Sequence, residues 1–313
     1  MPDNTLSTLL QIKTKIRRLT RSPSTAQISD QTLNDYINSF LLYDFPEYLQ
    51  TFSLRTTLTF YLEPYIDTYA GDNIITNFTN LYTNIYENVY VAGNKQSFFQ
   101  DRDQFFSLYP KVENISTIGV KGNGVRVAYG GTLAAKPVLR NHVLFSSVNT
   151  ANAGLQAHDD GAGNLVGDVA FGNINYITGV WALIFTSAPA NGATINSQTV
   201  PYVTGIPQAI LYYNNELTFR PVPDQPYRVE LEVSKRPTEL LNNASMPELS
   251  QWWQYIAYGA AKKIFEDRMD TESIERIMPE FKQQEILINT RTILKQSKER
   301  TATIYTNIYS NIY

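Results

Sequence analysis

Residues 210–219 read Ile-Leu-Tyr-Tyr-Asn-Asn-Glu-Leu-Thr-Phe. Two runs rich in aliphatic and aromatic residues flank Asn214-Asn215. An Asn pair suits the tight turn of a β-hairpin, because Asn tolerates a positive φ. Shortly downstream, Tyr227–Val233 alternates apolar and polar residues, as a strand with one buried face does. This part of the chain is therefore predicted to be antiparallel β-structure.

Upstream of the hairpin, residues 113–205 have the same character. They contain only 8 charged residues in 93, and short apolar runs such as 142–145 and 179–185 are separated by Gly, Asn and Pro. Short strands with regular turn residues between them are typical of a β-sandwich or barrel. Residues 248–300 contain 18 charged residues in 53, which indicates a different kind of structure.

Both ends of the chain show helical periodicity. Near the N-terminus, apolar residues recur at helical spacing in two segments, and Ser29 is expected to cap the second. These residues are Leu9, Ile12, Ile16 and Leu19, then Leu33, Tyr36, Ile37, Phe40 and Leu41. Arg55–Leu62 then reads as a strand.

Towards the C-terminus, Ser245-Met-Pro-Glu248 has the spacing of a capping box and is expected to begin a helix. The apolar stripe of that helix consists of Leu249, Trp252, Trp253, Ile256, Ala260 and Ile264. A second helical region is predicted over 271–300, with a break or kink at Pro279.

These patterns together predict an α+β fold. The N- and C-terminal segments would form a helical bundle, and an antiparallel β-sandwich or barrel domain would be inserted between them. The expected divisions are N-terminal helices in 1–54, a strand-containing connecting region in 55–112, a β-rich domain in 113–240, C-terminal helices in 241–300 and a docking tail in 301–313.

The composition argues against several kinds of chemistry. The 313 residues include no Cys and two His, His142 and His158. Thiolate chemistry is therefore excluded, and only two side chains are available for histidine-based catalysis. The segment from His158 to Asp168 gathers oxygen donors, but it lacks the calcium-loop spacing and reads better as an Asp/Gly turn than as a weak calcium site. We therefore expect no enzyme, and no catalytic, cofactor-binding or metal-binding residues.

Nothing in the sequence predicts a membrane segment or a secretion signal. The longest apolar run, Val180–Phe185, is far shorter than the roughly 18 residues that a spanning helix needs. The first residues contain no apolar stretch of signal-peptide length. The expected place of synthesis is the cytoplasm.

One nine-residue segment occurs twice in the sequence, as an internal repeat. Residues 82–90 and 305–313 are identical at seven of nine positions, and both copies are predicted to be strands. The second copy would either add as a strand to another chain or dock on its own domain. Its candidate contact residues are Tyr305, Ile308, Tyr309, Ile312 and Tyr313.

Further candidate partner contacts lie in the helical segments. Arg17 and Arg18 belong to a basic stretch. This stretch would contact phosphates, form a solvated face of the helix, or form ion pairs with an acidic neighbour. Trp252 and Trp253 would serve either the core or a subunit interface.

Several stretches carry a family resemblance. Glu216–Val233, Arg236–Leu240, Trp252–Ala261 and Leu33–Asn38 resemble the head-to-tail adaptor or tail-tube ring proteins of short-tailed phages. In that family a β-hairpin with repeated prolines leads into a helix with an aromatic residue followed by an Ala-x-Gly-Ala pattern. About two thirds of the chain takes part, and residues 113–205 exceed the small members of the family.

The resemblance implies a non-enzymatic virion protein at the head-to-tail junction, made in the host cytoplasm. Such proteins form rings, commonly of twelve copies. They contact the portal protein and further tail proteins, and they let double-stranded DNA pass without reading its sequence. No membrane and no cofactor is implied.

Two other functions stay open. A carbohydrate- or receptor-binding protein of the tail or baseplate would present tyrosines and Trp181 of the β-domain to a glycan. A polysaccharide-degrading enzyme would need two carboxylates at a fixed separation.

Overall fold

The computed structural model describes residues 7–45, 49 and 52–309, with the backbone alone for 294–309. The chain divides into two compact units. We call residues 1–58, 77–86 and 231–313 the helical unit, and residues 59–76 and 87–230 the β unit.

The predicted fold class is wrong. In the described residues the protein is mostly β-sheet, with four sheets, and it is not a helical bundle with one inserted β domain. The difference arises in the connecting region 55–112, whose strands pair with the distant segment 209–235 into two further sheets. Pairing over more than 100 residues leaves no local signal in the sequence.

The helical unit contains four main helices. They are α1 (Leu9–Leu19), α2 (Asp30–Ser39), α7 (Trp253–Asp267) and α8 (Thr271–Tyr309). The Ser29 hydroxyl accepts a hydrogen bond from the Thr32 amide, which confirms the predicted cap. A π-helical turn, η2 (Phe40–Asp44), continues α2.

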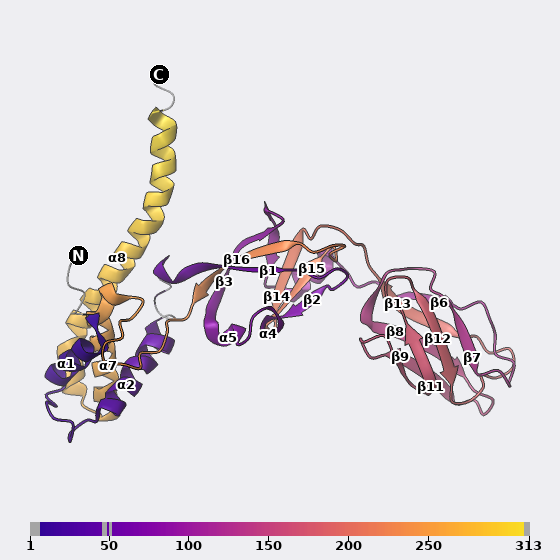
Figure 1. The fold of residues 1–313 in the computed structure, drawn as a ribbon, viewed down its shortest axis with the longest axis horizontal. Coiled ribbons are helices and arrows are strands. Elements are labelled where there is room, and N and C mark those ends of the chain that lie inside the picture. Colours follow the sequence, from indigo (N-terminus) through magenta and orange to yellow (C-terminus); the bar gives the residue numbers. More distant parts are fainter. Residues whose placement is uncertain (1–6, 46–48, 50–51, 310–313) are drawn as a thin grey trace. The chain divides into compact units, whose positions relative to one another are not determined.

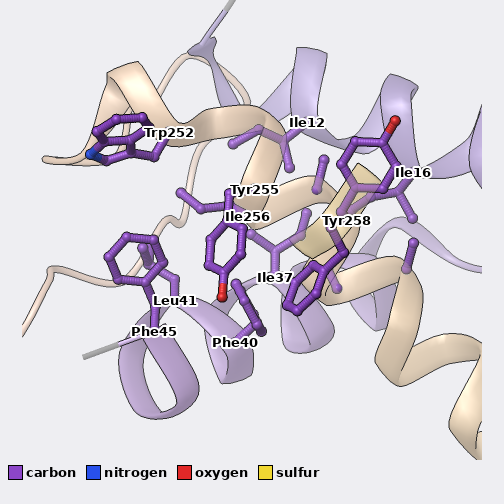
Figure 2. Packing of buried hydrophobic residues seen from close by; sticks show 14 of the residues in the cluster. Ile12, Ile16, Ile37, Phe40, Leu41, Phe45, Trp252, Tyr255, Ile256 and Tyr258 are labelled. Carbon is purple, nitrogen blue, oxygen red and sulfur yellow. The ribbon is translucent and has the colours of Figure 1, made fainter. Parts of the chain in front are cut away.

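Apolar side chains from these helices meet in one core. Figure 2 shows Ile12 of α1, Phe40 of η2 and Tyr255 of α7 turned toward a common centre. The Tyr255 ring stacks on Phe281 of α8 with 4.7 Å between centroids. The helices close to the two ends of the chain therefore share a single hydrophobic core.

Two details of the C-terminal helices differ from the prediction. The expected capping box does not begin a helix: Glu248 binds Lys235 and Thr238, and a 3₁₀ turn, η4 (Ser250–Trp252), precedes α7. Pro279 does not break α8, which runs as one helix from Thr271 (Figure 1). The capping-box prediction was wrong because it rested on a local signal that tertiary contacts override. The predicted break at Pro279 is wrong as well, whereas a kink there stays a prediction.

The β unit contains a sandwich, one of the two architectures predicted for residues 113–205. One sheet has the strand order β10-β9-β8-β13-β6 and the other β11-β12-β7 (Figure 1). Their bounds are β6 (Asn114–Thr117), β7 (Ala128–Thr132), β8 (Val138–Val148), β9 (Gly154–Asp159), β10 (Leu165–Gly167), β11 (Val169–Ile174), β12 (Val180–Phe185) and β13 (Asn196–Pro201). Phe145 and Trp181 pack between the sheets with ring centroids 4.5 Å apart.

Two smaller sheets complete the fold, with strand orders β1-β16-β3-β4 and β2-β15-β14-β5. Their strands are β1 (Arg55–Tyr61), β2 (Thr68–Ala70), β3 (Tyr82–Val91), β4 (Asn94–Lys95), β5 (Ser97–Phe99), β14 (Ala209–Tyr213), β15 (Glu216–Arg220) and β16 (Arg228–Lys235). Asn214 and Asn215 have φ of 52° and 60°, so the predicted hairpin turn is confirmed. Short helices α4 (Gly71–Ile74), α5 (Phe78–Leu81) and α6 (Arg102–Leu108) lie between strands in the sequence.

The two copies of the repeat have different structures. The first copy is β3, as predicted, whereas Tyr305–Tyr309 of the second belongs to α8. The strand prediction for the second copy is therefore wrong as far as Tyr309, and residues 310–313 lie outside the described residues. Strand pairing holds the first copy extended, whereas the second continues an existing helix.

Candidate interaction surfaces

Arg17 joins α1 to the start of α2. Its guanidinium lies 2.6 Å from the Asp30 carboxylate and also donates to the carbonyls of Ser22, Ser24 and Ile28. The hydrogen bond from Arg17 lowers the pKa of Asp30. Arg17 is therefore engaged within its own chain, and its neighbour Arg18 is the exposed member of the predicted pair.

A basic groove lies beside Arg17. Its volume is about 500 Å³, and Thr14, Arg18, Arg21 and Pro23 line it together with Arg17. In the part of the chain that the structure describes, no carboxylate forms an ion pair with Arg18 or Arg21. The groove therefore offers two uncompensated positive charges to an acidic or phosphate-bearing partner.

The two tryptophans have different environments. Trp252 is buried in the helical core, and the Arg291 guanidinium lies 5.1 Å from the centre of its ring. Trp253 is half-buried and packs against the same core. In the single chain, Trp252 thus contributes to folding, and only Trp253 offers part of its ring to a partner.

The predicted tail residues are only partly described. Tyr305, Ile308 and Tyr309 belong to α8, in the part described by its backbone alone. Ile312 and Tyr313 lie outside the described residues. Their role as partner contacts stays a prediction.

The structure adds an apolar surface on α8 that we did not predict. Ile286 and Ile293 are 64% and 62% exposed, and Leu287 lies beside Ile286 and is also exposed. The seven-residue spacing of the two isoleucines places them on one face. The seven-residue spacing is present in the sequence, but only the exposed fractions of the two side chains in the structure show that this face is uncovered.

The carboxylates of Asp159 and Asp160 accept hydrogen bonds from backbone amides. Asp159 is buried and accepts from the amides of Asn141 and Val143 and from the Tyr176 hydroxyl. Asp160 caps its own turn through the amides of Ala162 and Asn164. Within the described residues, no group of three or more acidic or histidine side chains is placed to hold a metal ion.

Trp181 does not face solvent. It is 3% exposed and packs on Phe145 inside the sandwich, so this indole cannot stack on a glycan in the folded chain.

Among the described helices, none is long and apolar enough to cross a bilayer.

No protein-family model and no curated protein matches the chain.

Proposed function

We propose that the protein is a structural subunit of a phage particle, forming a ring at the head-to-tail junction that joins the portal to the tail. The observation that carries this proposal is the uncovered apolar face of α8. An apolar patch that its own chain leaves exposed is characteristic of a contact with another protein.

The geometry of α8 supports a two-sided role. Ile277, Phe281 and Ile288 are buried against the helical core. Successive residues of an α-helix are about 100° apart, so Ile286 lies roughly 200° from Ile288, on the other side of the helix. One side of α8 holds the unit together, and the other is available to a neighbouring subunit or to the portal.

A ring requires two different surfaces on each subunit, so that each copy binds the next one head to tail. The α8 face is an apolar surface, and the groove at Arg18 and Arg21 is a basic one. The positive charge of the groove suits an acidic neighbour or transient contact with phosphates of passing DNA. The overall charge of −3 disfavours tight non-specific binding of DNA.

The test is assembly. We expect the purified protein to form rings in negative-stain micrographs, and Ile286→Glu combined with Ile293→Glu to give monomers with an unchanged circular dichroism spectrum. Met269→Glu is the matched control, because Met269 is also exposed in the helical unit but lies outside α8. A wild-type protein that stays monomeric with and without portal protein, or a double variant that still forms rings, would contradict the proposal.

The tail provides a second test. Deleting residues 301–313 is expected to leave a folded protein that is no longer incorporated into particles. Particles that assemble normally with the truncated protein would show that the tail is not a docking element.

A further inference from the structure

The β unit contains a pocket that the proposed structural function does not use. Its volume is about 410 Å³, within the range of small-molecule sites. One wall is the segment after α6, with Tyr109, Pro110 and Lys111. The other walls come from Val200–Val203 and from Arg220-Pro221.

Backbone hydrogen bonds and apolar packing hold the walls formed by Val200–Val203 and Arg220-Pro221 in place. The Tyr202 amide donates to the Pro137 carbonyl at 3.1 Å, and the Val222 amide donates to the Val203 carbonyl at 3.1 Å. Beneath them, Val200 and Val222 pack with Leu139 in a small buried cluster. A pocket supported in this way keeps its shape without a ligand.

Two cations line the pocket, and they differ in their partners. Arg220 is buried, and its charge is compensated by Asp67 at 3.0 Å. The Lys111 ammonium lies 3.4 Å from His142 Nε2 and 5.4 Å from the centre of the Phe106 ring. No carboxylate of the described chain forms an ion pair with Lys111, so this ammonium is the charge that a ligand would neutralise.

The tyrosines of the pocket supply flat surfaces and hydroxyl groups. Residues 113–205 contain three tyrosines, and Tyr202 is the half-exposed one, whereas Tyr129 and Tyr176 are buried. Burial raises the pKa of Tyr202 to about 12, so its hydroxyl stays protonated at neutral pH. Tyr109, on the opposite wall, is also half-exposed.

We propose that this pocket binds a small organic acid with a flat apolar ring. The ring lies against Tyr109, Tyr202 and the prolines, and the carboxylate pairs with Lys111. Charge complementarity favours an acid over a neutral ligand. The mainly apolar lining favours an aromatic or alicyclic ring over a sugar, because most hydroxyls of a sugar would find no hydrogen-bond partner there.

Titration calorimetry on the full chain tests the inference, with benzoate as the probe, benzyl alcohol as its neutral analogue and glucuronate as a sugar acid. We expect benzoate to bind at least about fivefold more tightly than either of the others, since an unpaired charge or hydroxyl costs about 1 kcal/mol or more. Lys111→Gln should weaken benzoate binding by a similar factor. Lys121→Gln is the control, because Lys121 is exposed and does not line the pocket.

A second variant locates the binding. Val203 lines the pocket and is 76% exposed, so Val203→Trp should fill the space without disturbing the core and should abolish the heat of benzoate binding. The inference is overturned if benzoate gives no heat at millimolar concentration, if Lys111→Gln and Val203→Trp bind it as the wild type does, or if benzyl alcohol or glucuronate binds as well as benzoate. None of these results depends on ring assembly.

Discussion

Gly259 of α7 is a residue at which the helical core admits no side chain. A Cβ atom built there would lie 2.2 Å from the Phe40 ring, whose centroid is 5.4 Å from that of Tyr255. The close approach of α7 to η2 therefore depends on glycine, although glycine disfavours a helix by up to about 1 kcal/mol.

Gly259→Ala is expected to lower the free energy of unfolding by about 1–3 kcal/mol, because overpacking outweighs the gain in helix propensity. Urea unfolding followed by far-ultraviolet circular dichroism measures it. Gly154→Ala is the control, since a Cβ at Gly154 meets no atom within 4 Å. Adding Phe40→Leu to Gly259→Ala should restore part of the loss, and a variant as stable as wild type would show that the two segments move apart easily.

Tyr176 and Asp159 make the stability of the sandwich depend on pH. Burial and the hydrogen bond to Asp159 raise the pKa of Tyr176 above its ordinary value of 10.0. The folded state thus favours the protonated phenol, so this contribution to stability is complete below pH 10 and is lost as the pH rises above 10.

Tyr176→Phe should cost roughly 1–3 kcal/mol at pH 8, because Asp159 loses a donor and the Gly163 amide loses its acceptor. The difference between the wild type and this variant should shrink between pH 9 and pH 11, in urea unfolding followed by tryptophan fluorescence. A difference that stays constant over this range would mean that Tyr176 titrates as it does in the unfolded chain.

At the scale of elements, α8 has one face that stabilises the helical unit and one that does not. Ile288 is fully buried and Ile286 is largely exposed, only two residues away on the same helix. Ile288→Ala should lower the free energy of unfolding by about 2–4 kcal/mol, and Ile286→Ala should change it by less than about 0.5 kcal/mol.

These values are measured by urea unfolding at a protein concentration at which the chain is monomeric. Equal losses for Ile288→Ala and Ile286→Ala would mean that both faces of α8 are covered in the free protein.

At the scale of the whole molecule, the sandwich is continuous in sequence and the two smaller sheets are not. Strands β6 to β13 pair only with one another among the described strands, and their shared core draws on residues 118–195. Strands β1 to β5 instead share their sheets with β14 to β16, more than 90 residues later.

A fragment of residues 113–203 should therefore fold alone, with a cooperative thermal transition and dispersed amide resonances. A fragment of residues 55–112 should stay unfolded, because its strands lack their partners. A fragment 113–203 without a cooperative transition would mean that the sandwich depends on the rest of the β unit.

Elements with local signals could be predicted from the sequence. Helical spacing predicted α1, α2 and α7, and the Asn214-Asn215 turn predicted its hairpin. The low charge and regular turns of residues 113–205 predicted a sandwich or barrel, and the structure shows a sandwich. The sequence also indicated Arg17 and Arg18 as candidate partner contacts, which stays a prediction. Only the structure shows that Arg17 is bound within the chain and that Arg18 is exposed.

Tertiary structure alone decided which distant segments pair. One copy of the repeated segment became a strand, whereas Tyr305–Tyr309 of the other copy joined a helix. Trp252 and Trp181 became buried, and Ile286 and Ile293 stayed exposed. The fold also brought Tyr109, Lys111 and Tyr202 around one pocket. The physical reason is that periodicity reports that a face is apolar, whereas burial depends on a partner that the chain brings from far along the sequence.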